Sequence, residues 1–221
     1  MQRRVWFSIF LVVGFMVGVL PVRAQDAKDK PAAPPDAAAK KDEKKAEAPR
    51  HDAEEWMKMG APGEHHKHLE PLVGKWNLVV KFPPETEGGA WSETPGKAEF
   101  RWAMGGRFLI EEVKSQIQGQ PFEWMCLHGY DNQKKKHVSA WIDNLGTEID
   151  QMDGTCGDGG KSLVYTAQVE EAHVGKFSIK WSMKLEAQDK LFIEMFSTPQ
   201  GGKEDKVMQV VGTRAASEVR P

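Results

Sequence analysis

A strict alternation of apolar and polar residues over positions 177–185 constrains the fold more than any other feature of this sequence. Every second residue of the stretch is large and apolar: Phe177, Ile179, Trp181, Met183 and Leu185. Successive side chains of a β-strand point to opposite faces, whereas at the helical period these residues would be scattered around a cylinder. The pattern therefore predicts a strand with one buried and one solvated face.

Similar stretches recur along the chain, separated by short segments rich in turn-forming residues. They predict further strands at residues 76–82, 98–104, 108–117, 122–130, 137–143, 147–152, 162–169, 191–196 and 207–213. Parallel strands would need crossover connections of a dozen or more residues, which these spacings do not allow. We therefore predict an all-β, antiparallel up-and-down barrel of about ten strands, because closure removes the exposed sheet edges. A sandwich, which usually needs longer Greek-key connections, is the alternative.

One short helix is predicted before the first strand. Residues 62–74 begin with Pro-Gly and end with Gly, and between them His65, Leu69 and Leu72 or Val73 recur at helical spacing. Such a helix would cover one end of the barrel.

The first 24 residues have the organisation of a secretory signal peptide. Arg3 and Arg4 form a basic start, residues 5–20 are apolar, and Val22-x-Ala24 offers small residues to a signal peptidase. The apolar stretch is shorter than the roughly 20 residues of a spanning helix and ends at a proline, which argues against a retained membrane anchor. We expect cleavage after Ala24 and export to the periplasm or the extracellular space, with no membrane span in the mature chain.

The rest of the chain divides into a tether, a domain and a tail. Residues 25–52 lack large apolar side chains and cannot bury enough surface to offset the cost of ordering, so we expect a disordered linker. A single domain over 53–214 and a C-terminal tail over 215–221 follow.

The signal peptide carries three arginines and no acidic residue, so its removal changes the formal net charge from −2 to −5. This acidity argues against a nucleic-acid partner.

The two cysteines, Cys126 and Cys156, could form a disulfide in an oxidising compartment. One pair lacks the density of a disulfide scaffold. The Trp and Phe content suffices for a core without a bridge, so we do not expect the domain to depend on one.

Two residues at the ends of the predicted sheet point to a particular closure. Gly74-x-Trp76 opens the first strand, and Arg214 closes the last. The same pair is typical of lipocalins and the wider calycin group, which this chain resembles in this respect. There the indole packs beneath the Arg in a cation–π contact, and the Arg donates to nearby carbonyls. The resemblance implies a calycin-like barrel closed by Gly74, Trp76 and Arg214.

Five short motifs carry a second resemblance. They are Pro-Gly-Glu-His-His-Lys at 62–67, Leu-Val-Gly-Lys-Trp at 72–76, Gly-Gly-Arg-Phe-Leu at 105–109, Gly-Tyr-Asp-Asn at 129–132 with Lys134 and Lys135, and Trp-Ile-Asp-x-x-Gly-Thr at 141–147. In this order they resemble the bacterial family called domain of unknown function 1579, over about residues 57–214. The resemblance implies a calycin-like barrel in exported or soluble bacterial proteins, many of them planctomycetal, with no established activity. The chain departs from the family pattern in carrying His65, His66 and His68 where we expect one histidine.

A predicted hairpin around the polar loop 131–136 is the best candidate site. One face of its first strand carries Phe122, Trp124, Cys126, His128 and Tyr130, and one face of its second carries His137, Ser139, Trp141 and Asp143. If Tyr130 pairs with His137, both sets share a face, whereas a slip of one residue would separate them. An inward face would line a pocket with aromatic walls and a few polar groups. Otherwise the aromatic residues fill the core and Asp143 anchors the next turn.

We select the candidate ligand-binding residues from this hairpin and its surroundings: Trp76, Arg107, Trp124, His128, Tyr130, Trp141, Asp143 and Glu194. Arg107 follows two glycines that suit a tight turn. It could project into the barrel mouth and pair with Glu112, Asp143 or Glu194, or bind an anionic ligand. Asp131 is expected to satisfy its own turn.

Catalytic and cofactor signatures are weak. The sequence contains no Gly-x-Ser-x-Gly, His-Glu-x-x-His, phosphate-binding Gly-x-x-x-x-Gly-Lys or Cys-x-x-Cys motif, and no catalytic residue is assigned. Glu112, Asp143, Glu148 and Glu194 could supply acid–base pairs, but the sequence favours none of them.

The histidines allow two cofactor hypotheses, and we predict neither. His65, His66 and His68 could begin a zinc site, but no Cys or Asp lies close by in the sequence, and a solvated helix start explains them equally well. Heme would require His128 or His137 to face a cavity.

Three functions remain open at the level of the sequence. We favour a non-enzymatic exported protein that binds a small, partly apolar ligand in its barrel. The first alternative is an enzyme that uses cavity carboxylates and Arg107. The second is a structural or partner-binding module on a flexible tether, for which an exposed apolar patch on the outer wall would be the sign.

Overall fold

The computed structural model describes residues 52–86, 88–171 and 174–216. The predicted signal peptide, the tether up to residue 51 and residues 217–221 of the tail lie outside the described residues. No helix in the described ranges is long and apolar enough to cross a membrane.

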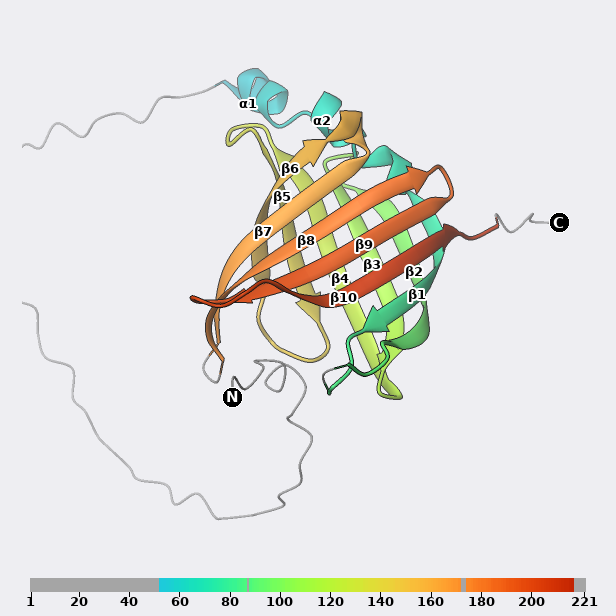
Figure 1. Cartoon of the computed structure of the whole chain (residues 1–221). Coiled ribbons are helices and arrows are strands. Elements are labelled where there is room, and N and C mark those ends of the chain that lie inside the picture. The colour runs from blue at the N-terminus through green and yellow to red at the C-terminus, as the bar shows by residue number, and fades with distance from the viewer. Residues whose placement is uncertain (1–51, 87, 172–173, 217–221) are drawn as a thin grey trace, which may run out of the picture.

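Ten antiparallel strands follow one another around a closed barrel, and β1 pairs with both β2 and β10 (Figure 1). The predicted up-and-down barrel is therefore confirmed. Its strands are β1 (Gly74–Phe82), β2 (Ser92–Ala103), β3 (Phe108–Ile117), β4 (Gln120–Asp131), β5 (Lys136–Asp143), β6 (Asp150–Gly157), β7 (Ser162–Glu171), β8 (Gly175–Ala187), β9 (Lys190–Pro199) and β10 (Asp205–Arg214). The helical segments are α1 (Ala53–Met59), α2 (Glu64–Lys67), η2 (Glu70–Leu72) and η3 (Asp158–Gly160).

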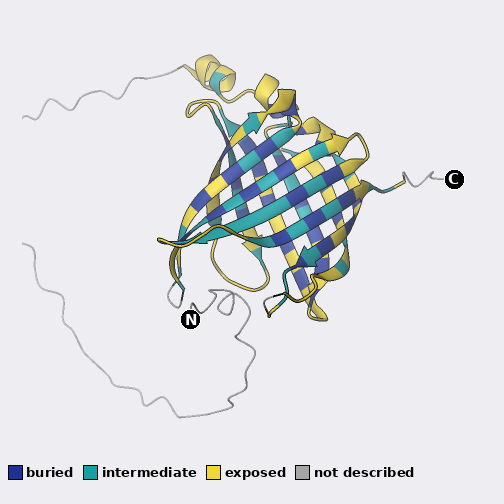
Figure 2. Cartoon of the chain, in the orientation of Figure 1, coloured by how far each residue is buried: buried dark blue, intermediate teal, exposed yellow. Residues whose placement is uncertain are grey.

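Buried and exposed residues alternate along the strands, as the period of two requires (Figure 2). The inward side chains form one core, in which Trp76, Phe100, Tyr165 and Trp181 are among the largest fully buried groups. Burying a large apolar side chain stabilises a fold by about 1.5–3 kcal/mol, so this core is the main source of stability.

The two ends of the barrel differ. We call the end that carries α2, η2, η3 and the loops at 104–107 and 132–135 the helical end; α2 covers it in Figure 1. We call the opposite end, with the loops at 118–119, 144–149 and 200–204, the loop end.

Arg214 closes the helical end as the lipocalin resemblance implies. Its guanidinium lies 4.2 Å from the centre of the Trp76 ring and donates to the carbonyls of Pro71 and Val73 at 2.7 and 2.6 Å. The Trp76 indole in turn donates to the Leu72 carbonyl at 2.8 Å. These contacts join η2 to β1 and β10. The barrel closes where these two strands pair.

Several elements differ from the expectation. The helix α1 was not predicted, and β2 begins at Ser92 instead of Ala98. The helix predicted over 62–74 consists of two short pieces, α2 and η2, because Pro71 cannot donate a backbone hydrogen bond to a continuing α-helix. The strand predicted at 147–152 is β6, which begins at Asp150 and continues to Gly157. The preceding residues form a loop, because Asp143 accepts hydrogen bonds from the backbone of Leu145 and Gly146.

Candidate functional site

The β4–β5 hairpin has the register on which the sequence argument depended. Tyr130 pairs with His137, and His128 pairs with Ser139. Further along, Trp124 pairs with Asp143. The polar and aromatic residues of both strands therefore share the inner face of the barrel, and the indoles of Trp124 and Trp141 stack with centroids 5.3 Å apart.

A buried carboxylate lies beside this hairpin. Glu111 on β3 is fully buried; one oxygen accepts from the Trp124 indole at 3.1 Å, and the other lies 2.8 Å from Nε2 of His128. Burial and the neighbouring Glu111 raise the pKa of the Cys126 thiol well above its ordinary value. A thiol that stays protonated is a poor nucleophile, so this cluster has the chemistry of a buried hydrogen-bond network.

Several polar atoms of the barrel interior have no hydrogen-bond partner among the described residues. Around the middle of the barrel they are Nδ1 of His128, Oγ of Ser139, the Tyr165 hydroxyl and Nε1 of Trp181. These four residues come from two pairs of adjacent strands, β4–β5 and β7–β8, between which β6 lies. His128 pairs with Ser139, and Tyr165 pairs with Trp181. Because buried polar groups are nearly always hydrogen-bonded, such a concentration calls for a physical explanation.

At the helical end, three histidines from two separate segments meet. His65 and His68 belong to α2 and its C-cap, and His137 is the first inward residue of β5. One ring nitrogen from each lies within 4.8 Å of the other two. The ring of His65 also stacks on Tyr130 at 4.3 Å between centroids.

The three clustered histidines at 65, 66 and 68 have two different roles. His66 is buried, and its Nδ1 accepts a hydrogen bond from the Gly63 backbone at 3.0 Å. His66 therefore starts the short helix, while His65 and His68 turn toward His137. Burial, with the nearby His68 and His65, lowers the pKa of His137 to about 4, although the Gly129 carbonyl opposes this lowering.

The loop end carries acidic groups instead. Asp143 accepts from the Trp141 indole at 2.9 Å and from the following turn, which is the anchoring role considered from the sequence. Burial raises the pKa of Asp150, and Glu148 and Asp143 raise it further. Burial likewise raises the pKa of Glu171, with contributions from Glu148, Asp150 and Asp143.

The structure contradicts the predicted placement of three charged residues, Arg107, Glu112 and Glu194, in or beside the barrel interior. Arg107 is exposed in the turn at the helical end and donates to the Met104 carbonyl at 3.1 Å, whereas Asp143 lies at the opposite end. Glu112 points to the outer wall, where it pairs with Arg101. Glu194 also faces outward and pairs with Lys206. Both glutamates occupy strand positions that alternate with inward residues, so neither can reach the barrel interior.

The structure also identifies interior residues that the sequence argument missed. Glu111 was passed over, although it follows Leu109 and precedes Val113 at a spacing of two, a pattern that places it inward. Tyr165 on β7 also points inward and is fully buried. A Cβ at Gly154 would collide with its ring. Both cysteines are free. Trp76 is committed to the closure with Arg214 and is fully buried.

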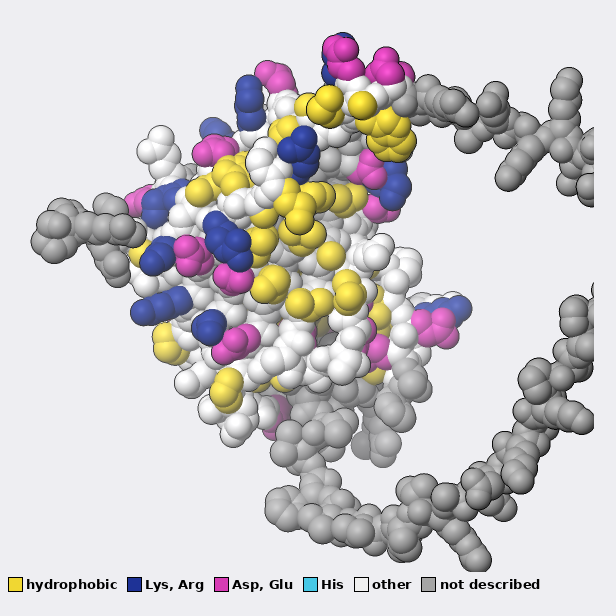
Figure 3. Space-filling view, turned by 180° about the vertical axis from the view of Figure 1, so that it is seen from behind, with side chains coloured by type: hydrophobic (Ala, Val, Ile, Leu, Met, Phe, Trp, Pro, Cys, Tyr) yellow, Lys and Arg dark blue, Asp and Glu magenta, His cyan; other side chains and the backbone are white. Residues whose placement is uncertain are grey.

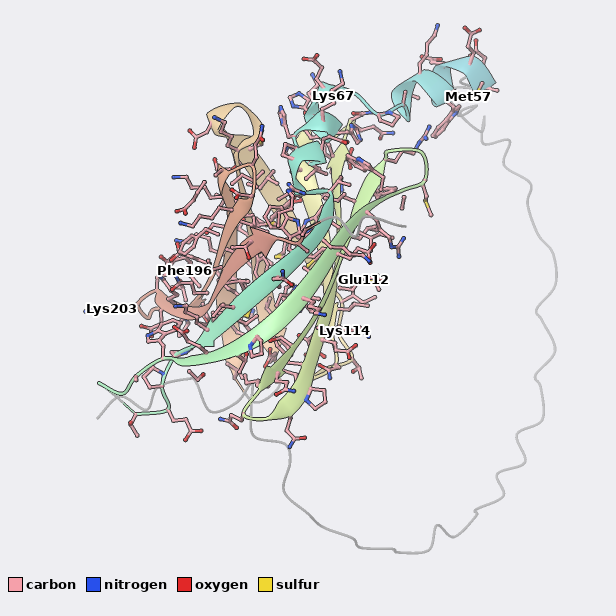
Figure 4. All side chains as sticks on the ribbon, turned by 90° about the vertical axis from the view of Figure 1, so that its right-hand side faces the viewer. Met57, Lys67, Glu112, Lys114, Phe196 and Lys203 are labelled. Carbon is pink, nitrogen blue, oxygen red and sulfur yellow. The ribbon has the colours of Figure 1, made fainter. Side chains whose placement is uncertain are left out.

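An apolar patch lies on the outer wall over β3, β4 and β5. Met125, Leu127 and Ile142 are 38%, 40% and 41% exposed, and Met125 pairs with Ile142 across the sheet. Figure 3 shows hydrophobic side chains gathered on this side of the molecule. Beside them is a shallow depression of about 400 Å³, partly lined by Glu112 and Lys114, which lie on the outside of the barrel in Figure 4.

A family model described as "Protein of unknown function (DUF1579)" matches residues 61–214, which include the closure, the hairpin and the three converging histidines. The chain belongs to the DUF1579 family. This DUF1579 domain has no significant match among curated proteins.

Solved structures resemble the DUF1579 domain in fold. The crystal structure of Rv2717c from M. tuberculosis has a TM-score of 0.51 and 15% identity, covering 71% of this chain and 100% of that one. The S-type phycobiliprotein lyase CPES from Guillardia theta has a TM-score of 0.48 and 8% identity, covering 74% and 99%. A redesigned β-barrel has a TM-score of 0.34 and 12% identity, covering 68% and 96%. The likeness to Rv2717c concerns the fold alone.

Proposed function

We propose that this DUF1579 domain is a non-enzymatic protein that binds a small, partly apolar molecule inside its barrel. The observation that carries the proposal is the group of four unpartnered polar atoms on β4, β5, β7 and β8. Each buried polar group without a hydrogen bond costs about 1–3 kcal/mol. A ligand that supplies the missing hydrogen bonds would remove this cost on binding.

The surroundings of these atoms indicate the chemical class of the ligand. The Trp141 and Trp181 rings, 4.9 Å apart between centroids, offer an apolar wall. The Trp181 indole can only donate, so the ligand must carry an acceptor such as a carbonyl or carboxylate. The hydroxyls of Ser139 and Tyr165 can donate or accept. An apolar body with one polar group fits this arrangement.

The side chains of Trp181, Tyr165 and His128 are almost completely buried, so a ligand must displace some of them as it enters. Association that requires a conformational change is slower than simple docking. We therefore expect slow, temperature-dependent uptake. The buried, protonated Cys126 and the fully engaged Glu111 support a binding role over a catalytic one.

The test is native mass spectrometry of the chain isolated from its own host, followed by titration with dodecanoate, indole-3-acetate and protoporphyrin IX. The interior tryptophans report uptake through their fluorescence. Replacing both Ser139→Ala and Tyr165→Phe should weaken binding by about tenfold for each lost hydrogen bond. The matched control is Ser182→Ala, whose hydroxyl faces the outer wall near the Glu194 carbonyl. A protein that carries no small molecule and responds to none of the probes would refute the proposal.

The proposed site of action is outside the cytoplasm, because the first 24 residues have the pattern of a cleavable signal peptide. Expression of the full chain in a bacterial host followed by N-terminal sequencing should give a mature protein that begins at Gln25. A mature chain that keeps Met1 would contradict export by this route.

A second candidate function is self-association through the apolar patch. The patch is bordered by the ion pairs Lys114–Glu123 and Arg101–Glu112, so both signs of charge lie beside Met125 and Leu127. A copy related by a two-fold axis could place each sign opposite its complement. Sedimentation equilibrium should then show a dimer that Leu127→Lys dissociates. A monomer at all concentrations would exclude this role.

A further inference from the structure

The three histidines at the helical end come from segments far apart in the sequence. The ring centroids of His65 and His68 are 5.4 Å apart, and those of His68 and His137 are 5.7 Å apart. Their spacing of three residues brings His65 and His68 to one side of α2, and β5 brings His137 beneath them.

Three buried nitrogens of these rings make no hydrogen bond of good geometry within the described protein. His137 is 2% exposed, and neither of its ring nitrogens makes a hydrogen bond of good geometry with the described residues, although the Gly129 backbone lies close to the ring. Nδ1 of His68 is also buried without a partner. If these rings served only to fill space, a phenyl ring would do so without leaving buried nitrogens unpaired.

Several contacts hold the two segments in this arrangement. The side chain of Asn132, in the β4–β5 loop, donates to the carbonyls of Met59 and Ala61 at 2.8 and 2.9 Å and so fixes the segment that leads into α2. A Cβ on Gly160 would lie only 3.1 Å from the His68 ring, so this glycine of η3 allows His68 its position. The three imidazoles are therefore pre-positioned by the fold, as a metal site requires.

We propose that His65, His68 and His137 bind one divalent first-row transition-metal ion, with zinc as the best fit. Three histidine ligands with an open fourth position are a known zinc donor set. Zinc–nitrogen bonds of 2.0–2.1 Å in a tetrahedron place the nitrogens about 3.3 Å apart. The present separations, within 4.8 Å, need only side-chain rotation, which the exposed His65 can provide. The donors are all nitrogens, so calcium and magnesium, which prefer oxygen, are disfavoured.

The ion would lie at the helical end of the barrel, between α2 and the start of β5. The site does not depend on the interior ligand proposed above, because its donors are distinct from His128, Ser139, Tyr165 and Trp181. Metal binding and ligand binding can therefore be measured, and can fail, separately.

The experiment is isothermal titration of the full chain, first dialysed against a chelator, with zinc chloride alone. We expect one ion per chain, and with cobalt chloride the visible absorption of tetrahedral Co²⁺. Each of the substitutions His65→Gln, His68→Gln and His137→Gln should weaken zinc binding by about 100-fold or more, because loss of even an outer partner of a metal ligand costs 10–100-fold.

The matched control is His66→Gln, which changes the neighbouring histidine that caps the Gly63 backbone instead of facing the site. It should leave the stoichiometry and affinity unchanged. Circular dichroism checks the fold of every variant. If His137→Gln does not fold, the less buried His65 and His68 carry the test. The proposal is overturned if the unmodified chain binds no zinc at micromolar concentrations, or if binding survives these substitutions.

Discussion

Two consecutive glutamates on β3 show how strongly side-chain direction decides the role of a residue. Glu111 is fully buried and contacts Trp124 and His128, whereas Glu112 lies on the outer wall and pairs with Arg101 at 3.3 Å. Removing one partner of a buried pair leaves the other uncompensated, which costs about 3–5 kcal/mol. We expect that loss for Glu111→Ala and less than about 1 kcal/mol for Glu112→Ala, measured by urea unfolding. Equal losses would mean that the Glu111 contacts contribute little.

The Tyr165 hydroxyl leads to a prediction of the opposite sign. It is buried without a partner among the described residues, so Tyr165→Phe should stabilise the ligand-free domain by about 1 kcal/mol. Chemical denaturation followed by tryptophan fluorescence measures the change. Destabilisation by a similar amount would show that the hydroxyl has a partner in solution.

The sequence could predict the inward direction of His128, Tyr130, His137 and Asp143, because alternation fixes direction once the hairpin register is known. It could not predict that His137 meets His65 and His68. That contact depends on where α2 docks, which the Asn132 side chain helps to determine through its two hydrogen bonds. Local pattern carries no information about such long-range docking.

At the scale of elements, the closure between β1 and β10 should contribute strongly to stability. Arg214 combines a stacked guanidinium with hydrogen bonds to Pro71, Val73 and Gln188. Lysine cannot make this planar set of contacts. Arg214→Lys should therefore lower the free energy of unfolding by about 2 kcal/mol, whereas Arg101→Lys, at an exposed pair, should change it by less than about 0.5 kcal/mol. Thermal unfolding of both variants makes the comparison, and similar melting temperatures would contradict it.

The elements that the sequence predicted well are those with strong alternation, such as β3 and β8. β6 was misplaced because its second half contains Gly154 and Gly157, which have low strand propensity. Tertiary packing overrides this propensity, since Gly154 gives the Tyr165 ring its space. The helix was predicted as one piece because the helical spacing of its apolar residues continues past Pro71. The backbone cannot continue as an α-helix there, because proline has no N–H to donate.

Across the whole molecule, ionisable groups are divided between the two ends of the barrel. Histidines gather at the helical end, while Asp143, Glu148, Asp150 and Glu171 gather at the loop end. Burial and the neighbouring carboxylates raise the pKa values of Asp150 and Glu171 at the loop end. In the pH range in which carboxyl groups titrate, the free energy of unfolding should therefore depend on the carboxyl groups of the loop end.

The sign of that dependence follows from the raised pKa values of Asp150 and Glu171. A carboxyl group whose pKa is higher in the folded state contributes stability below its unfolded pKa of about 4 and loses it as the pH rises through the folded pKa. Asp150→Asn should therefore stabilise the domain by about 0.5 kcal/mol at pH 7, and this gain should disappear as the pH falls below about 4. Asp131→Asn is a control for which the opposite change in stability is expected, because backbone hydrogen bonds from Lys134 and Gln133 lower the pKa of Asp131. It should destabilise the domain at pH 7, an effect that is lost at acidic pH. Melting temperatures of the three proteins across this range decide the matter, since a pH-independent gain for Asp150→Asn would attribute its effect to packing instead of charge.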